Sequence, residues 1–422
     1  MIAMTETGYS GLAPVDLSGR DAADPLARFR EFFDLPEGVI YLDGNSLGAL
    51  PRRAEQIALK VLRHDWREGL IRSWNDAGWY DLPRRLGDKI AGLVGAVPGE
   101  VVMADSTSVN LFKVLAAALR LRPGRSVVVS ERDNFPTDLY IAEGLARLVG
   151  QGHELRLVDT PAQLHEAVRE DCAVLMLTHV NYRDGAMHDM AALTRLAHRH
   201  GALAVWDLAH SAGAVEVDLN GSAADFAVGC TYKYLNGGPG APAFVFAARR
   251  WQAQCEQPLS GWWGHAAPFV FDSGYRPEAG IGRFLCGTPA VLSMAVAEAG
   301  IDLMAEATPA RVRAKSVALC EAFIALVEHH CAGFGLELAS PREAALRGSQ
   351  VSFRHREGYA IMQALAERGV LGDYREPGIL RFGFAPLYVR YADIGNAALA
   401  LKDVLATRAW DQPRHLARRA VT

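Results

Sequence analysis

Short apolar runs alternate with longer amphipathic stretches through the middle of the chain. Five runs rich in β-branched and aromatic residues suit buried strands: 127–129, 173–177, 203–206, 226–230 and 244–246. Four stretches have the apolar spacing of helices: 109–121, 138–148, 161–170 and 187–200. Strands that alternate with helices over this length predict an α/β fold in which helices flank a mainly parallel sheet.

The pattern changes after about residue 290. Helical periodicity covers 289–305 and 311–329, followed by a strand at 350–353, a helix at 359–368 and a strand at 379–384. This order predicts a smaller α+β unit that is separate from the central sheet. We therefore expect three parts: an N-terminal arm (1–50) that contributes to the small domain, a large domain (51–290) and a C-terminal small domain (291–422).

The composition is that of an ordinary globular protein. Of the 422 residues, 50% are hydrophobic and 22% are charged, and the formal net charge is −4. A charge of this sign and size gives no basic surface for nucleic acid or anionic lipid. The tail with Arg414, Arg418 and Arg419 is expected to be solvated. We expect a cytoplasmic protein that acts on a small molecule, with no nucleic acid and no membrane as a partner.

Neither the cysteines nor the histidines have the spacing of a crosslinked or metal-binding protein. The six cysteines, which we expect to be reduced and buried, include no C-x-x-C pair. The histidines fall outside the spacing of zinc ligands. The N-terminus lacks the charged start and apolar stretch of a secretory signal, and no run approaches the roughly 18 apolar residues of a membrane span. We expect no disulfide, metal site or membrane segment.

Lys233 is the most informative residue of the chain. It lies in the glycine-rich run TYKYLNGGPG at 231–240, downstream of Asp207, which follows the apolar run 203–206. Most lysines are solvated, and an aspartate after a strand is most often a cap or turn residue. Together, however, an amine on a tight loop and a carboxylate at a strand end are what pyridoxal 5'-phosphate requires, because the amine forms a Schiff base and the carboxylate keeps the ring nitrogen protonated. The pair predicts an enzyme that starts from an amino acid.

His210 and the segment before residue 110 add candidate contacts for this cofactor. His210 is placed to lie near the ring, although a buried histidine bonded to the backbone would by itself explain it better. The sequence DSTSVN at 105–110 follows a strand-like run, so its hydroxyls and amides would bind a phosphate at a helix N-terminus. A plain Ser/Thr helix cap explains the same sequence. The absence of a glycine-rich phosphate loop argues against P-loop and dinucleotide folds.

Three further segments carry candidate chemistry with an alternative explanation. In FPTD at 135–138, Phe135 can stack on a flat ring and Asp138 can bond near its oxygen, or the segment is an ordinary turn. The tryptophan pair at 262–263 would reach a phosphate or substrate, or would form a subunit interface. Arg381 lies inside an apolar run and needs an anionic partner, which is either a substrate α-carboxylate or an internal carboxylate.

Together these motifs resemble the kynureninase family, pyridoxal-phosphate hydrolases of tryptophan catabolism. The resemblance rests on YLDGNSLG at 41–48, FPTD at 135–138, DLAH at 207–210, TYKYLNGGPG at 231–240 and GWWGH at 261–265, in the family's order. DLAH with TYK indicates only the broad superfamily, whereas FPTD with GWWGH narrows it to this family. The implied fold is the fold type I PLP-dependent transferase-like one, with a large PLP-binding domain and a smaller α+β C-terminal domain.

The resemblance also implies a role for individual residues. Lys233 would hold the cofactor aldehyde, Asp207 would pair with the ring nitrogen, and Arg381 would hold the substrate carboxylate. The remaining cofactor contacts would come from Thr107, Ser108, Phe135, Asp138, Thr178, His210, Tyr232, Trp262 and Thr288. Trp262 and Thr288 would act from the neighbouring subunit, so the resemblance implies a homodimer.

The implied reaction is hydrolysis of the Cβ–Cγ bond of L-kynurenine to anthranilate and L-alanine, on a route that also feeds NAD biosynthesis. Lys233 would take the Cα proton, and Tyr232 is the candidate proton relay for the fragment that becomes alanine. Gly287 and Thr288 stand where animal members have Ser-Asn, so the chain looks closer to the bacterial form. Its preference between kynurenine and 3-hydroxykynurenine is left open.

Two other functions compete with this one. Cysteine desulfurases and class V aminotransferases commonly have histidine before the lysine, where this chain has Tyr232, and only Cys286 is a candidate for a mobile catalytic cysteine. A non-catalytic protein on the same scaffold is the other alternative, against which an intact Lys233, Asp207 and Arg381 argue. A Ser-His-Asp hydrolase is not expected, because no G-x-S-x-G elbow is present.

Overall fold

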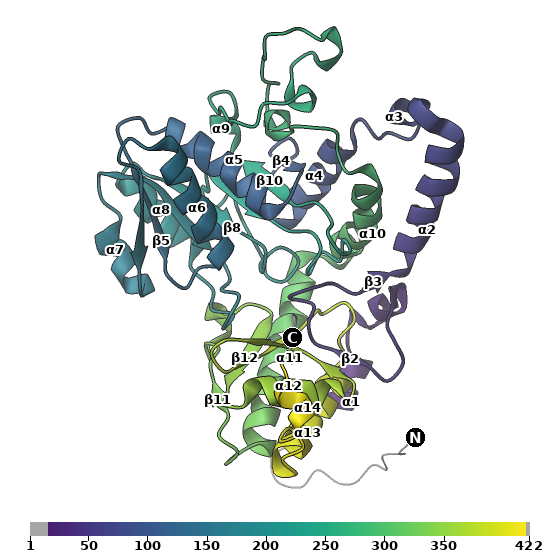
Figure 1. Ribbon diagram of the computed structural model, residues 1–422. Coiled ribbons are helices and arrows are strands. Elements are labelled where there is room, and N and C mark those ends of the chain that lie inside the picture. Colours follow the sequence, from purple (N-terminus) through teal and green to yellow (C-terminus); the bar gives the residue numbers. More distant parts are fainter. Residues whose placement is uncertain (1–15, 419–422) are drawn as a thin grey trace.

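A seven-stranded sheet forms the centre of the larger part of the molecule (Figure 1). The computed structural model describes residues 16–418, so the start of the predicted arm and Arg419 lie outside the described residues. The strands are β4 (Val101–Met103), β5 (Val127–Glu131), β6 (Glu154–Val158), β7 (Cys172–Thr178), β8 (Leu203–Asp207), β9 (Phe226–Gly229) and β10 (Phe244–Ala247). They lie in the order β4-β10-β9-β8-β7-β5-β6, and only β10 runs antiparallel to its neighbours. The predicted mainly parallel sheet is confirmed.

Helices bury both faces of this sheet, which is why its strands are continuous apolar runs. In β7, Leu175 and Leu177 belong to one apolar cluster and Val174 and Met176 to another, because successive side chains point to opposite faces. The cluster of Val174 includes residues of α5 (Thr107–Arg120) and α6 (Pro136–Val149). The cluster of Leu175 includes residues of α4 (Leu82–Leu93) and α8 (Met190–Arg199).

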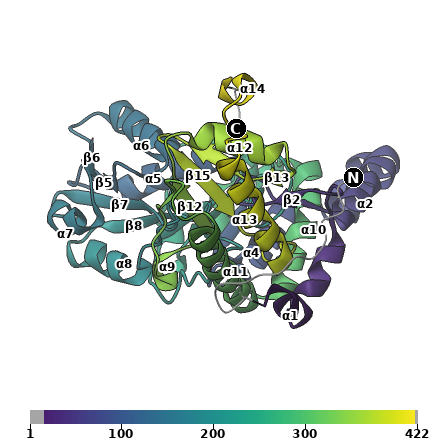
Figure 2. The same cartoon turned by 90° about the horizontal axis from the view of Figure 1, so that it is seen from below.

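The C-terminal part is the predicted α+β unit, drawn in the lower half of Figure 1. Its antiparallel sheet consists of β11 (Glu337–Leu338), β12 (Gln350–Arg354), β15 (Ile379–Gly383) and β14 (Asp373–Arg375). The helices of this part are α11 (Pro309–His330), α12 (Gly358–Ala366) and α13 (Tyr391–Ala406), which lie together in the view of Figure 2. A smaller α+β domain beside a larger parallel-sheet domain is thus the observed fold class.

The chain before residue 50 lies against this C-terminal unit. β2 (Ile40–Tyr41) pairs in parallel with β13 (Val370–Leu371), and α1 (Leu17–Ala22) packs against α13. After α2 (Arg52–Lys60), the chain enters the larger part. α10 (Val291–Ala307) packs against α2 and α4, so its contacts lie with the larger part although it begins just past residue 290. The division into 1–50, 51–290 and 291–422 stays our proposal.

Two general features of the described residues bear on function. No helix in the range 16–418 is both long and apolar enough to cross a membrane. All six cysteines are free; five are buried and Cys286 is partly exposed. Within the same range, no group of three or more His, Cys, Asp or Glu side chains is arranged to hold a metal ion.

Candidate active site

Most of the predicted site residues line a single cavity of about 200 Å³. These residues are Thr107, Ser108, Phe135, Asp138, Thr178, Asp207, His210, Tyr232 and Lys233. The topology explains why they meet: Thr178 and Asp207 end the adjacent parallel strands β7 and β8 and are partners across them. Carboxyl ends of parallel strands share one edge of the sheet, where ligands bind in open α/β folds. Trp262, Thr288 and Arg381 lie outside the lining of this cavity.

Lys233 lies on a tight loop between β9 and β10. Thr231 Oγ donates a hydrogen bond to the Pro242 carbonyl at 2.6 Å, which closes the loop across its base. Gly48 packs on its outside: its amide donates to the Tyr232 carbonyl at 2.8 Å, and a Cβ at this position would collide with the Lys233 carbonyl oxygen. Glycine is therefore required at position 48. The N-terminal motif at 41–48 supports the loop that presents the lysine.

The Lys233 amine faces His210 across the cavity. Its Nζ lies 3.0 Å from His210 Nε2 and 6.0 Å from the centre of the Phe135 ring. Burial and the charge of Lys233 hold the pKa of His210 well below its usual value, so the imidazole is neutral and its Nε2 accepts a hydrogen bond from the amine. His210 Nδ1 is buried without a hydrogen-bond partner among residues 16–418.

Two buried carboxyl groups, Asp207 and Asp138, close the other side of the cavity. Asp207 accepts a hydrogen bond from the Ala209 amide at 2.7 Å, and burial raises its pKa although Lys233 opposes the shift. Burial and the neighbouring Asp207 raise the pKa of Asp138 well above the usual range. Two carboxyl groups this close do not both ionise readily, so we infer that Asp138 holds the proton. Asp138 Oδ2 is buried with no partner in the described part of the chain.

The start of α5 supplies the predicted anion site. Ser106 is the cap: its Oγ accepts from the Val109 amide at 3.4 Å. Thr107 and Ser108, the first residues of the helix, line the cavity. The helix-cap interpretation holds for Ser106, and Thr107 and Ser108 are left free to meet a ligand in the cavity, so phosphate binding there stays a prediction.

These residues fit pyridoxal 5'-phosphate. The buried carboxyl group of Asp207 would pair with the ring nitrogen, and the Lys233 amine would react with the aldehyde. The start of α5 would bind the phosphate. The two orphaned polar atoms, on Asp138 and His210, also require partners that the described protein does not supply. A buried polar atom without a partner is costly, so these two indicate that a polar ligand belongs in the cavity.

Arg381 lies beside the cavity in a network of charged side chains. It is 1% exposed, and its Nε and Nη2 grip both carboxyl oxygens of Asp373, its register partner on β14. Nη2 also donates to Ser46 Oγ at 2.8 Å, and Nη1 donates to the Tyr182 carbonyl at 2.5 Å. Arg375 forms a second ion pair with Asp373 at 2.7 Å. Of the two anionic partners that the sequence allowed for Arg381, the internal carboxylate is therefore present. Tyr182, which also lines the cavity, connects this network to it.

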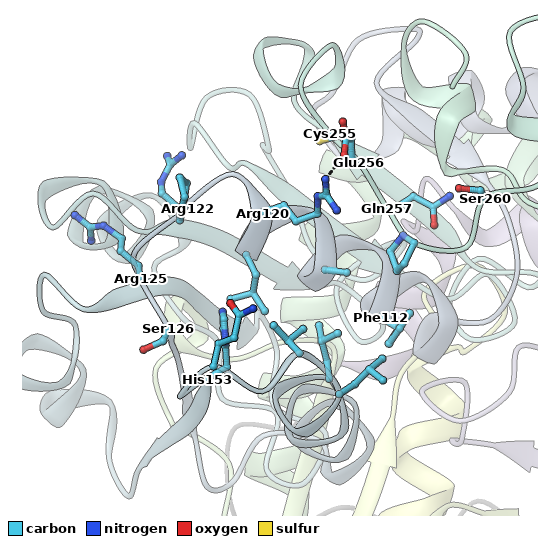
Figure 3. A pocket seen from close by; sticks show the side chains of 18 of the residues that line it. Phe112, Arg120, Arg122, Arg125, Ser126, His153, Cys255, Glu256, Gln257 and Ser260 are labelled. Atoms are coloured by element: carbon cyan, nitrogen blue, oxygen red, sulfur yellow. Dashed lines mark hydrogen bonds and ion pairs between the residues drawn. The ribbon is translucent and has the colours of Figure 1, made fainter. Parts of the chain in front are cut away.

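A larger cavity of about 890 Å³ lies elsewhere, between α5, α6 and the segment 255–260 (Figure 3). Its charged side chains already have partners: Arg120 pairs with Glu256, and Arg122 and Arg125 donate to backbone carbonyls. The rest of its lining is largely apolar and includes Phe112 and Leu145. The chemistry of the lining, rather than the volume, makes the smaller cavity the candidate active site.

Comparison with known proteins identifies the family. The family model for the kynureninase C-terminal domain matches residues 312–401. The kynureninase of Burkholderia pseudomallei (strain K96243) is 58% identical over 95% of this chain and 98% of its own length. The chain belongs to the kynureninase family. A second member, the kynureninase of Pseudomonas fluorescens, is 56% identical over 96% of this chain and 99% of its own.

Solved structures place this kynureninase-family chain in the fold of PLP-dependent enzymes. A cysteine desulfurase from Thermococcus onnurineus NA1 superposes with a TM-score of 0.76 at 19% identity, over 90% of this chain and 98% of that one. A C-DES variant with glycine covalently linked to its PLP cofactor gives 0.75 at 17% identity, over 89% and 99%. At these identities the likeness shows the fold alone, and the desulfurase alternative is not favoured.

Sequence reasoning missed several residues that shape this kynureninase-family site. Asp43 and Ser46 belong to the motif at 41–48, which marked the family without giving either residue a role. Asp373 stands on a strand that was not predicted. Asn134, next to FPTD, accepts a hydrogen bond from Thr178 Oγ1. For Asp43, Ser46 and Asn134 the available signal was a polar residue inside or directly beside a recognised motif, whereas Asp373 had no such signal.

Asp43 gives this network a dependence on pH. Burial and the charge of Asp373 raise the pKa of Asp43 to about 7. Below pH 7, Arg375 and Arg381 outweigh Asp373 and leave about one positive charge; above it, ionised Asp43 cancels that charge. We expect KM for an α-amino acid substrate to rise about tenfold between about pH 6 and pH 8.5, the effect of roughly 1.4 kcal/mol. The same shift lowers folding stability as pH rises from about 4 to about 7, because the unfolded carboxyl ionises first.

Initial-rate measurements across this range check the prediction, with Asp43→Asn as the control. The variant is neutral at every pH, so its KM should stay near the low-pH value of the parent protein. A variant whose KM still rises through pH 7 would show that another group is responsible.

Proposed function

We propose that this protein is a kynureninase, which hydrolyses the Cβ–Cγ bond of L-kynurenine to anthranilate and L-alanine with pyridoxal 5'-phosphate as cofactor. The observation that carries the proposal is identity of 56–58% to kynureninases over nearly the whole chain. The cavity around Lys233 supports it with the residues that the family resemblance implied. When bound, the cofactor supplies an electron sink for the charge that develops on the substrate.

The residues of the cavity divide the proton chemistry among them. Lys233 Nζ is the base that we assign to the Cα proton, because it is the amine that lines the cavity and its hydrogen-bond partner there is a neutral imidazole. Burial raises the pKa of Tyr232, so its hydroxyl keeps its proton and can donate it to the fragment that becomes alanine. Asp207 would stabilise a positive charge on the ring nitrogen of the cofactor. Phe135 provides an apolar ring face in the lining of the cavity.

Arg381 is assigned to the α-carboxylate of the substrate. Two arginines share one buried carboxylate in Asp373, so the network has an excess of positive charge beside the cavity while Asp43 is protonated. The guanidinium is held on three sides by Asp373, Ser46 and the Tyr182 carbonyl. A guanidinium that is already held rigidly loses little entropy when it binds a further anion, which favours this role.

A homodimer with shared active sites is part of the proposal. Trp262 is 39% exposed, and it is followed by Phe269, Val270 and Phe271, which are 64%, 67% and 81% exposed. The segment 262–271 that carries them belongs to the green stretch of chain at the top of Figure 1, and so large an apolar group needs a protein surface to cover it. Thr288 is exposed as well, as its assigned role in a partner's site requires. Light scattering that finds an active monomer would rule this out.

We further propose a cytoplasmic place for the enzyme in tryptophan catabolism, on the route that also leads toward NAD. A soluble composition and a small-molecule substrate support this location. Whether 3-hydroxykynurenine is also a substrate depends on the aryl pocket, which Gly287 and Thr288 are proposed to border. Parallel assays with both compounds decide it.

Product analysis tests the proposed reaction. The purified protein is loaded with cofactor, mixed with L-kynurenine, and the products are separated by chromatography. We expect anthranilate and L-alanine in equal amounts. Pyruvate instead of alanine, or no reaction with kynurenine together with sulfide release from L-cysteine, would overturn the proposal in favour of another enzyme of the same fold.

A further inference from the structure

Lys113 is a fully buried lysine that the proposed reaction does not use. It lies in the second turn of α5 and is 0% exposed. Its amine forms an ion pair with Asp105 and donates a hydrogen bond to the Phe284 carbonyl at 2.6 Å. Helical side chains slant toward the helix N-terminus, so the amine reaches back past the first turn to the loop that precedes the helix. A buried lysine is rare and needs a reason for its place.

Asp105, the partner of Lys113, has a strained backbone. Its φ is +43°, in the left-handed region that residues other than glycine seldom adopt. It also lines the active-site cavity, directly before Ser106, Thr107 and Ser108. Strain of this kind persists only where the surroundings impose it, and it is frequent at functional sites. The ion pair with Lys113 is the strongest contact that the Asp105 side chain makes.

The Phe284 carbonyl extends this link to the segment that is proposed to act in the partner subunit's site. Phe284 ends the turn Ile281–Phe284, which leads through Cys286 to Thr288. The Cys286 carbonyl in turn accepts a hydrogen bond from the Trp263 amide at 3.1 Å, next to Trp262. One amine therefore touches both the loop before α5 and the segment that carries Trp262 and Thr288.

We propose that Lys113 is a positioning residue for the cofactor phosphate, which acts by holding Asp105 in its left-handed conformation. That conformation turns the amides and hydroxyls at the start of α5 toward the cavity. The inference rests on the proposed cofactor site and adds a residue that does not itself touch the cofactor. Loss of Lys113 would loosen the phosphate end of the site and leave the Lys233 end unchanged.

The test compares two forms of the cofactor that differ only in the phosphate. Apoenzyme is titrated with pyridoxal 5'-phosphate and with pyridoxal, and binding is followed by absorbance. The parent protein should prefer the phosphorylated form. In Lys113→Met this preference should fall about 10- to 100-fold, through weaker binding of the phosphorylated form, while the affinity for pyridoxal stays the same.

Lys315→Met is the matched control. Lys315 is also a buried lysine, which pairs with Asp24 at 2.6 Å and donates to the Pro386 carbonyl at 2.6 Å, away from the cavity. Its loss should cost stability and leave the phosphate preference of the parent protein unchanged. Should Lys113→Met keep the parental preference, the inference is overturned; a parent protein without any preference would instead refute the proposed cofactor site.

A double variant tests the route through Asp105. Lys113→Met together with Asp105→Gly removes both partners of the ion pair, of which only Lys113 is fully buried. Glycine adopts a positive φ without strain, so the double variant should regain part of the lost preference. A double variant as poor as Lys113→Met, or equal losses in Lys315→Met, would overturn the proposed role of Lys113.

Discussion

Replacing Lys233 by alanine should lower kcat by about 10⁴-fold or more. The variant loses the amine that binds the cofactor covalently and the base assigned to the Cα proton, and a single general base contributes roughly 10²- to 10⁴-fold. The visible absorption band of the bound cofactor should disappear as well. Steady-state kinetics and an absorbance spectrum measure both effects.

The same substitution should leave the fold intact. The amine of Lys233 makes one side-chain hydrogen bond, to His210, so its loss should cost about 1 kcal/mol or less of folding free energy. Lys89→Ala is the control, because Lys89 pairs with Glu298 and Asp302 at the surface of α4. Its kinetics and spectrum should match those of the parent protein. A Lys233→Ala protein that keeps substantial activity would refute the assignment.

Replacing Arg381 by lysine should raise KM for L-kynurenine about 10- to 100-fold. Lysine keeps the charge but lacks the planar fork, and one lost charge-assisted hydrogen bond is worth roughly 1.5–3 kcal/mol. The effect on kcat should be smaller, because Arg381 lies outside the lining of the cavity where the bond is cleaved. Initial rates over a range of kynurenine concentrations separate the two parameters.

Arg347→Lys shows whether a rise in KM is specific. Arg347 is also 1% exposed, and it is held by Glu321 and the Arg342 carbonyl rather than by groups near the cavity. Both variants should lose stability, since each disturbs the ion pair of a buried arginine. Only Arg381→Lys should change KM. An equal rise in both variants, or none in Arg381→Lys, would mean that Arg381 serves Asp373 alone.

The central sheet was predictable because burial on both faces leaves a simple mark in the sequence. Its strands at β5, β7, β8, β9 and β10 are apolar runs between helical stretches. β6 lies at the sheet edge and has no regular burial pattern, since it begins at exposed Glu154, continues through three partly buried residues and ends at buried Val158; it was not predicted. The predicted helix at 161–170 is shorter, since a turn at Pro161–Gln163 and α7 (Leu164–Ala167) end at extended Val168.

Other elements escaped prediction because tertiary contacts rather than periodicity define them. α13 is rich in alanine and has no clear apolar stripe, yet it is buried between α11 and α12. The two-residue strands β2 and β13 exist only because they pair with each other across more than three hundred residues of chain. Segments this short carry no period of their own.

The residues of the candidate site likewise fall into those that the sequence predicted and those that it did not. Lys233, Asp207 and FPTD could be found because each is a local motif at the end of an apolar run. The partner of Arg381 could not, because Asp373 reaches it through the register of β14 and β15. The contact of Gly48 with the lysine loop is likewise a matter of spatial approach. Local sequence motifs therefore indicate the reacting groups. The residues that hold those groups in place depend on strand register and on contacts between distant segments, which the sequence does not reveal.

Borohydride reduction of the cofactor-loaded protein tests whether Lys233 is the residue that binds the cofactor covalently. Reduction fixes the cofactor to the amine that holds it, and mass spectrometry of the digested protein locates that amine. We expect a phosphopyridoxyl group on the peptide that contains Lys233, and none in the Lys233→Ala variant. A label on another lysine, such as Lys113 or Lys89, would contradict the account.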